Sequence, residues 1–487
     1  MHIAIVVKVI GILLMIFSLL GNLPPVIVSF LYGDGVAPAF LISSVIIFTT
    51  GFFLWTVTAR QKKELSNRDG FLVVTLFWAV LGTAGCLPFL LSTDIDLSLT
   101  DAVFESISAL TTTGATVISG LDDLPKSILF YRQLLQWMGG MGIIVLALAL
   151  LPMLGIGGMQ LYRAESPGPI KDNKLVPRLA ETAKSLWYIY LSLTVACALA
   201  YWAVGMDAFD AISHSFSTIA IGGFSTHDAS LGYFENPMIE LVAVLFMFIA
   251  GINFALHFIT WNKKQHTGIR HYFQDSEFLF YGFILLSVSI VTILILYFSG
   301  VYSNAGDAFV KGLFQVVSFA TTTGFTTADF NSWPLFLPYV LLYAAIIGAC
   351  AGSTGGGMKV IRILLIFKQG FREVQRLIHP RAVIPIKLGK KVMSDRVIES
   401  VWGFFAVYVM AFMVMLLALL ATGLDIITAF SAVGASINNL GPGLAGVAQN
   451  YAALPGTAKW ILCFAMLLGR LEVFTLLVLF TPMFWKR

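Results

Sequence analysis

Residues 101–114 of this sequence read DAVFESISALTTTG, and three later stretches align with them without gaps: DAISHSFSTIAIGG (210–223), KGLFQVVSFATTTG (311–324) and TAFSAVGASINNLG (428–441). The glycines that end them are 109, 101 and 117 residues apart, so each copy has about the length of two membrane spans with a short segment between them. The position six residues before each glycine is small in every copy: Ser108, Ser217, Ser318 and Ala435. The sequence therefore predicts four copies of one unit, each with a short helix that packs closely against its neighbours.

The composition around these stretches is that of a membrane protein. The chain has 487 residues, of which 58% are hydrophobic and only 11% are charged, whereas about a quarter of the residues of a soluble domain are charged. Unbroken apolar runs of about twenty residues favour helical spans over barrel strands, which alternate over about ten residues. The net charge of +4 is small, so binding to nucleic acid is disfavoured.

Long and short apolar segments alternate along the chain. Ten long segments are each expected to cross the membrane: 5–30, 36–59, 71–91, 134–156, 186–204, 238–261, 278–300, 335–367, 398–422 and 459–485. Four short segments are too brief and too polar to cross alone: 101–118, 208–226, 308–327 and 426–444. We therefore expect an all-α polytopic membrane protein with ten transmembrane helices plus four re-entrant pore loops in pseudo-fourfold repeats. Its expected units are an N-terminal pair of helices (1–66) and pore repeats at 67–160, 161–262, 263–370 and 371–487.

Basic residues mark alternate loops. Of the 30 lysines and arginines, 24 lie in the loops 60–68, 157–184 and 261–274, in the stretch 359–396, and at the C-terminus. Because cytoplasmic loops retain basic residues, we expect both termini in the cytoplasm. The opposite face carries 15 of the 26 acidic residues, mostly near the starts of the short segments. Two interpretations stay open there: simple loss of basic residues from translocated loops, or acids gathered at the mouth of a cation pathway.

Four glycine-bearing loops around one axis would bring their carbonyl oxygens together in rings. Such rings replace the hydration shell of a bare cation, and helices whose carboxyl ends face the axis add negative potential. For a single segment, small and hydroxyl-bearing residues more often serve helix packing. Four segments in register at domain-length spacing favour the ring.

The loop sequences resemble a known family. TTTGAT, IAIGGFST, TTTGFTT and NNLGPGL, with AGSTGGGMKVIR in the third copy, look like the Trk/Ktr/HKT superfamily of potassium transporters. The run LYRAESPGPIKDNKLVPRLAETAK and the N-terminal pair of spans resemble the TrkH-type membrane subunit of bacterial Trk systems.

The resemblance implies a channel-like K⁺ filter built from four segments. They are Thr111, Thr112, Thr113 and Gly114; Ala220, Ile221, Gly222 and Gly223; Thr321, Thr322, Thr323 and Gly324; and Asn438, Asn439, Leu440 and Gly441. In relatives, serine at the first of these glycines accompanies sodium selectivity, so Gly114 favours potassium. The fourth copy departs from the others, because two asparagines and a leucine replace threonines.

The span 335–367 is too long for one crossing and is dense in glycine, which destabilises a helix. The resemblance makes this stretch an intramembrane gate under the filter, formed by Gly348, Gly352, Ser353, Thr354, Gly355, Gly356, Gly357 and Lys359. A phosphate-binding loop is the competing interpretation, but GxxxxGK[ST] fails because Met358 follows Gly357 and Val360 follows Lys359.

Arg470 lies in the apolar final segment with Glu472 beside it. A charge at that depth is costly and usually functional, and the resemblance implies a constriction below the filter that repels cations. The alternatives are a local salt bridge with Glu472 or a contact to a carbonyl of the glycine loop. His214, inside the second pore segment, is interpreted as a packing residue.

The resemblance also implies potassium uptake across the bacterial inner membrane, with K⁺ as transported substrate and no organic cofactor in this chain. Its implied partners are a second copy of the chain and a cytosolic TrkA-type ring that binds NAD(H) or ATP/ADP; the basic stretch 368–396 could contact membrane lipid. A carrier that couples K⁺ to H⁺ or Na⁺ by alternating access stays open. An intramembrane enzyme is disfavoured because HExxH and GxSxG are absent from the sequence.

Overall fold

Helices form nearly all of the regular structure in the computed structural model, which describes residues 2–61, 65–142, 179–261, 268–334, 336–389 and 391–486. The exception among these residues is a two-stranded antiparallel hairpin, β1 (Lys387–Leu388) with β2 (Lys391–Val392). The expected all-α class therefore holds except for this hairpin.

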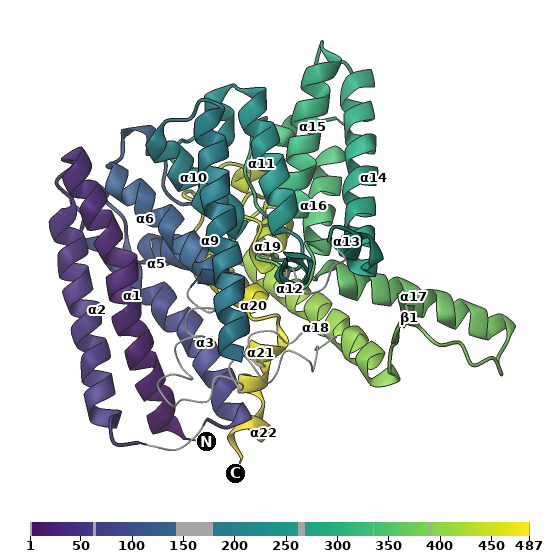
Figure 1. Ribbon diagram of the computed structural model, residues 1–487, viewed down its shortest axis with the longest axis horizontal. Helices are drawn as coiled ribbons and strands as arrows, with labels where there is room; N and C mark the ends of the chain where they lie inside the picture. The colour runs from purple at the N-terminus through teal and green to yellow at the C-terminus, as the bar shows by residue number, and fades with distance from the viewer. Residues whose placement is uncertain are drawn as a thin grey trace.

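The N-terminal pair consists of α1 (Ile3–Tyr32) and α2 (Ala37–Thr58), which lie side by side at the edge of the molecule (Figure 1). Gly11 and Gly51 meet where the helices pack. A Cβ added at Gly11 would lie 2.7 Å from the Gly51 carbonyl oxygen, and one at Gly51 would lie 2.6 Å from the Gly11 oxygen. Small residues permit this close approach of two backbones in apolar surroundings.

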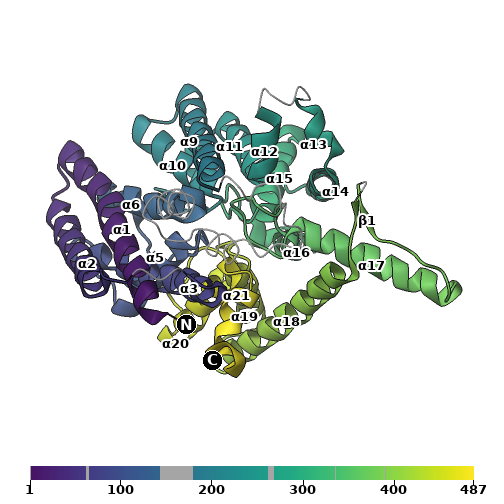
Figure 2. The same cartoon turned by 60° about the horizontal axis from the view of Figure 1, so that its bottom comes forward.

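Four units of long helix, short helix and second helix follow. The first unit has α3 (Asn67–Ala84), α5 (Leu99–Leu110) and α6 (Lys126–Trp137), and the second has α9 (Leu179–Ala203), α10 (Ala208–Ala220) and α11 (Pro237–Ala250). The third has α14 (Ser276–Phe298), α15 (Ala305–Ala320) and α16 (Leu337–Ile347), and the fourth has α18 (Asp395–Leu420), α19 (Ile426–Ile437) and α20 (Gly456–Arg470). Figure 2 shows the four units grouped around a common centre, with α1 and α2 outside them.

Each short helix, or pore helix, begins with a polar cap. Ser98, Asp207 and Asp425 each accept the amide N–H of the residue three positions later, and Asn304 accepts that of Gly306. A helix that starts inside a membrane protein needs such acceptors because its first amide groups have no partner in the helix. Two of the acids expected at the outer mouth are therefore helix caps.

The second helix of each unit is interrupted, which the sequence predicted only for the third. A bend of 89° separates α11 from α12 (Phe254–Trp261), and one of 108° separates α20 from the segment Phe474–Phe480, which begins with α21 (Phe474–Leu477). The expected spans at 238–261 and 459–485 are thus broken within their length, and whether each crosses the membrane stays a prediction. In the third unit α17 (Val360–Ile378) follows α16 after the glycine-rich loop, as predicted. In the first, α6 passes into a π-helical turn at Met138–Gly142, and residues 143–156 of the expected span lie outside the described residues.

Within the described residues, six helices are long and apolar enough to cross a membrane, or eight if each bent pair counts as one span. The number ten thus stays a prediction.

The two termini lie close together at one end of the molecule (Figure 1). The His2 amide donates to the Asp69 carboxylate at 2.9 Å, and the neighbouring Arg68 donates to the Lys486 carbonyl at 2.6 Å. Short helices α4 (Leu87–Leu91), α13 (Arg270–Gln274) and α22 (Pro482–Trp485) complete the described α-helices, and α17 with the start of α18 projects sideways.

Candidate functional site

The four candidate filter segments, residues 111–114, 220–223, 321–324 and 438–441, meet in a closed ring. A Cβ added at Gly114 would lie closer than 3.0 Å to the carbonyl oxygen of Gly222, one at Gly223 to that of Thr323, and one at Gly324 to that of Leu440. The series returns to its start, since a Cβ at Gly441 would lie 2.7 Å from the Thr113 oxygen. Each glycine thus faces the third-position carbonyl of the next segment, and all four segments surround one centre.

The backbone has the same conformation in all four segments. The second residue has a positive φ in each, 56° at Thr112, 54° at Ile221, 65° at Thr322 and 53° at Asn439, and the final glycine has φ between 77° and 98°. Left-handed φ is rare for side-chain-bearing residues and above all for a β-branched one such as Ile221. The sequence repeat is therefore also a repeat of a strained backbone.

The small position found in the sequence marks where each segment folds back onto its pore helix. The third residue of every segment donates its amide N–H to the carbonyl of this position at 2.8 Å, for example Thr113 to Ser108 and Leu440 to Ala435. Because each segment directly follows the carboxyl end of α5, α10, α15 or α19, four negative helix ends are brought to the ring.

Side-chain hydrogen bonds support three of the segments, the first and third from within and the fourth through contacts outside it. The Thr111 and Thr113 hydroxyls are 2.8 Å apart, and those of Thr321 and Thr323 are 2.7 Å apart. In the fourth segment, Asn439 donates to the Thr113 hydroxyl at 2.9 Å and to the Met466 carbonyl at 3.0 Å. The second segment, Ala220 to Gly223, carries no polar side chain. The copy that differs most in its support is therefore the second, whereas the sequence drew attention to the fourth.

A further column of residues holds the chain that leaves each segment. Nine residues before the glycine stand Glu105, His214, Gln315 and Ala432. Glu105 accepts from the Val117 amide at 2.9 Å, His214 Nε2 lies 2.9 Å from the Ser225 hydroxyl, and Gln315 donates to the Phe325 carbonyl at 3.5 Å. In the fourth unit Ser431 takes this role by accepting from the Leu444 amide at 2.8 Å. His214, interpreted from the sequence as a packing residue, is buried and also makes this hydrogen bond to the chain after the filter. The column was readable in the aligned stretches and was missed.

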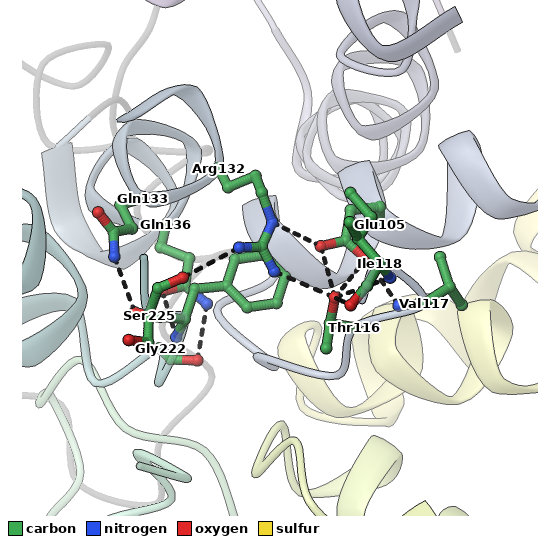
Figure 3. Close-up of polar contacts among 10 residues, drawn as sticks. Glu105, Thr116, Val117, Ile118, Arg132, Gln133, Gln136, Gly222 and Ser225 are labelled. Atoms are coloured by element: carbon green, nitrogen blue, oxygen red, sulfur yellow. Dashed lines mark hydrogen bonds and ion pairs between the residues drawn. The ribbon is translucent and has the colours of Figure 1, made fainter. Parts of the chain in front are cut away.

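A buried arginine joins the first two units (Figure 3). Arg132 and Glu105 are both fully buried, and Arg132 Nε lies 2.8 Å from Glu105 Oε1. The same guanidinium donates to the Ser225 carbonyl at 3.0 Å and to the Thr116 hydroxyl at 3.0 Å, so it contacts the chain after both segments. A buried pair of this kind is tolerated only when its remaining hydrogen bonds are satisfied. The two residues lie 27 positions apart in the sequence, so no local pattern pairs them.

The glycine-rich loop, residues 348–359, lies directly against the third and fourth segments. The Gly356 amide donates to the Thr322 hydroxyl at 2.7 Å, and the Gly357 amide to the Asn438 carbonyl at 3.1 Å. A Cβ at Gly355 would lie 2.8 Å from the Thr321 carbonyl oxygen. The glycines are therefore required by close approach of the loop to the backbone above it, besides their effect on helix stability.

The other side of the loop pairs with the break between α11 and α12. Cys350 donates its amide N–H to the Gly251 carbonyl, and Phe254 donates to the Gly352 carbonyl, both at 3.0 Å. Glu277, at the start of α14, accepts the Ala351 amide at 2.6 Å. The Ser353 hydroxyl donates to the Cys350 carbonyl within the loop, and the Thr354 hydroxyl donates to the Ile219 carbonyl in α10 of the second unit. The loop is thus fixed between the filter segments, the second unit and α14 of its own unit.

Arg470 lies at the meeting point of these parts. Its guanidinium donates to the Thr112 hydroxyl at 3.2 Å, to the Thr354 carbonyl at 3.1 Å and to the Gly140 carbonyl at 2.7 Å. One of the expected alternatives, contact with a glycine-loop carbonyl, is therefore present. Glu472 forms an ion pair with Arg362. Lys359, with φ of 76° and 7% exposed, donates to the Gly355 carbonyl and closes the loop on itself.

On the outer side, charged contacts join successive units. His227 bonds Asp122 of the first unit at 2.5 Å and Asp210 of the second at 3.2 Å. Glu240 pairs with Lys311 at 2.6 Å between the second and third units, and Asp101 pairs with Lys459 at 2.6 Å between the first and fourth. Burial alone would lower the pKa of His227, but the hydrogen bonds to Asp210 and Asp122 outweigh it and the pKa is raised. Many acids of the outer face therefore already have partners.

The chemistry available at this site is coordination by backbone oxygen. Within the residues that the structure describes, no group of three or more His, Cys, Asp or Glu side chains is placed to hold a metal ion. Main-chain carbonyls in a ring suit a weakly bound monovalent cation.

Known proteins are similar to this chain over nearly all of its length. The family model for TrkH, described as a cation transport protein, matches residues 36–487. The Trk system potassium uptake protein TrkH of Vibrio parahaemolyticus is 57% identical over 481 residues, which is 99% of each chain. The protein of that name from Escherichia coli is 55% identical over 487 residues and all of both chains. The crystal structure of the potassium transporter TrkH from Vibrio parahaemolyticus matches with a TM-score of 0.91 at 54% identity, covering 100% of both chains.

Proposed function

Because the chain belongs to the TrkH family of cation transport proteins, a family of transporters and not of enzymes, we propose that it takes up potassium through a filter made by the four candidate segments. K⁺ enters from the face on which the acidic residues gather, loses its water at the carbonyl ring, and passes the glycine-rich loop to the cytoplasm. An inside-negative membrane potential contributes about 2.3 kcal/mol per charge per 100 mV, which favours accumulation without a second ion.

The closed ring of glycines and third-position carbonyls carries this proposal. It supplies oxygen atoms from four directions at one centre, at the carboxyl ends of four pore helices. Oxygen rings of this kind replace the hydration shell of a monovalent cation. The printed names of the close relatives, potassium uptake proteins of the Trk system, agree with K⁺ as the substrate.

The loop 348–359 and Arg470 form the proposed gate. The loop lies against the third and fourth segments, and the Arg470 guanidinium links Thr112, Thr354 and Gly140 across three units. A fixed positive charge beside the cation path raises the barrier to passage. Opening requires that the loop leave its contacts with Thr322 and Asn438.

The proposal extends to assembly and location. The chain works as a homodimer in the bacterial inner membrane, with both termini in the cytoplasm. Each copy is divided into its N-terminal helix pair and four pore repeats at residues 66, 160, 262 and 370. A cytosolic TrkA-type ring that binds NAD(H) or ATP/ADP controls the gate, and the basic stretch 368–396 contacts lipid headgroups.

Rubidium uptake by cells that lack their own potassium transporters tests the filter. We expect Gly223→Ser and Gly324→Ser to abolish uptake or its preference for K⁺ over Na⁺, because both added Cβ atoms would lie closer than 3.0 Å to a neighbouring carbonyl oxygen. Gly370→Ser in α17 is the matched control, since nothing lies within 4 Å of its added Cβ. Unaltered uptake and selectivity in both filter variants would refute the assignment.

Single-channel recording from purified protein tests the pathway itself. Discrete openings in a lipid bilayer are expected for a continuous pore. Transport without any unitary current would favour a coupled carrier instead.

A further inference from the structure

The second filter segment differs from the other three in how its backbone is held. Its residues, Ala220 to Gly223, offer no hydroxyl or amide side chain, so the internal bonds seen between Thr111 and Thr113, and between Thr321 and Thr323, have no counterpart there. Its third and fourth residues are both glycines, which restrict the backbone least. By composition it is the segment least able to keep its own shape.

A side chain from a different unit compensates for this. Gln136, fully buried on α6 of the first unit, donates from Nε2 to the Gly222 carbonyl at 2.6 Å and accepts at Oε1 from the Phe224 amide at 3.1 Å (Figure 3). The two partners fix the orientation of the carboxamide, because a carbonyl requires a donor and an amide N–H an acceptor. Gln136 therefore bridges Gly223 and restrains the backbone on both of its sides.

Gly222 and Gln136 are matched in shape. A Cβ at residue 222 would lie closer than 3.0 Å to the Gln136 carboxamide carbon, oxygen and nitrogen. A threonine at this position, as in the first and third segments, would collide with the glutamine. The second segment thus lacks the hydroxyl pair at the same place where the Gln136 side chain occupies the space and supplies the hydrogen bond.

The Gly222 oxygen is the third-position carbonyl that faces Gly114 in the ring. Thr113, Thr323 and Leu440 hold the equivalent carbonyls, and none of these three, all described, accepts a hydrogen bond from a side chain. A carbonyl oxygen has two lone pairs, so the bond from Gln136 leaves one for an ion.

From this geometry we infer that Gln136 is a positioning residue for ion selectivity, which holds the Gly222 carbonyl at the radius that suits K⁺. The inference rests on the proposed function and adds a residue outside the filter to it. Without the restraint, the segment with two adjacent glycines moves inward around a smaller ion, and the ring loses its discrimination against Na⁺.

The test compares two neighbouring glutamines of α6. Gln136→Met keeps the side-chain volume and removes both hydrogen bonds. Gln133→Met also keeps the volume, and it removes the hydrogen bond that the fully buried Gln133 donates to the Phe224 carbonyl at 3.1 Å, beyond the filter. We expect Gln136→Met to lower the preference for Rb⁺ or K⁺ over Na⁺ by about tenfold, equivalent to about 1.4 kcal/mol, while transport continues. Gln133→Met should keep the wild-type preference.

Gln136→Leu carries the test if the methionine variant does not accumulate in the membrane. Leucine also removes both hydrogen bonds, to the Gly222 carbonyl and from the Phe224 amide, so this variant should be as unselective as Gln136→Met. Wild-type selectivity in Gln136→Leu or in a well-accumulated Gln136→Met variant would overturn the inference, as would equal loss in Gln133→Met. A wild-type chain without K⁺ preference would instead refute the proposed function.

Discussion

The four filter segments repeat one structure, whereas the second helices beneath them differ from unit to unit. The four segments repeat one backbone conformation and close into a ring of equivalent contacts. The second helices below them are not equivalent: α6 passes into a π-helical turn, those of the second and fourth units bend by 89° and 108°, and that of the third is broken by a glycine-rich loop. Ion coordination benefits from symmetry, whereas a gate needs one part that moves differently from the rest. Under the proposed function, selectivity and gating therefore fall in separate layers of the molecule.

The layer with fourfold repetition depends on the buried pair behind it. We expect Arg132→Met to lower the free energy of unfolding by about 3–5 kcal/mol, because it leaves the Glu105 carboxylate buried without its partner. Denaturation of the purified protein in detergent measures this. The double variant Arg132→Met/Glu105→Gln should recover much of the loss.

Arg376→Met is the control for that experiment. Arg376 pairs with Glu373 at 3.1 Å, but its side chain is 42% exposed, so its loss should change stability by about 0–1 kcal/mol. Equal effects of Arg132→Met and Arg376→Met would show that the upper layer does not depend on the buried pair.

Gly356→Ala addresses the irregular layer. The added Cβ would lie closer than 3.0 Å to the Asn438 carbonyl oxygen, and overpacking of this kind costs about 1–3 kcal/mol. We expect the loop to be displaced from the filter and Rb⁺ uptake to change by about tenfold, with Gly370→Ala unchanged as the control. Wild-type uptake in Gly356→Ala would mean that the loop does not govern the pathway.

Arg470→Ala sharpens the distinction between the layers, because its contacts belong to both. A unit charge about 4 Å from a cation in water-like surroundings contributes about 1 kcal/mol, so removing the guanidinium should raise basal flux without a regulatory partner by about fivefold. Arg470→Lys, which keeps the charge, should stay near the wild-type rate. If both variants transport at the wild-type rate, Arg470 only ties the units together.

The smallest change in stability is expected from a substitution at His227, which lies between the first and second units. Its folded pKa is raised above the ordinary value of 6.5 by hydrogen bonds to Asp210 and Asp122 that outweigh burial. The protonated form therefore stabilises the fold fully below pH 6.5, and this contribution is lost as pH rises through the folded pKa.

His227→Gln should accordingly lower the midpoint of thermal unfolding by about 2 °C at acidic pH and by less at alkaline pH. His379→Gln, at an exposed position after α17, is the control. A His227→Gln effect that does not vary with pH would exclude the charged bond between the units.

The regular layer is also the part that the sequence predicts. The regular spacing in the sequence identifies four glycines: Gly114, Gly223, Gly324 and Gly441. Glycine occupies these positions because each has a positive φ and lies close to a carbonyl of the neighbouring segment. The column with Glu105 and His214 is equally visible once the stretches are aligned. Its role in holding the chain after the filter follows only from the fold, because that chain must turn back onto the pore helix to reach these side chains.

The irregular layer leaves weaker signals. Glu472 and Val473, at the sharpest bend, have positive φ values of 50° and 59° although neither residue favours them. Contacts from other units, such as the ion pair of Arg362 with Glu472, accompany this conformation. No local pattern of propensity encodes it. Gln136 was missed for the same reason, since its two partners lie 86 and 88 residues away along the chain.

The ring of glycines closes between the first and last segments, where Gly441 meets the Thr113 carbonyl. During synthesis, residue 113 enters the membrane long before residue 441 has left the ribosome. Three of the four segments of the ring are therefore synthesised before the fourth is available to close it. The last unit to be synthesised completes the ring, so a chain that ends before residue 441 lacks the contact between Gly441 and the Thr113 carbonyl that closes it.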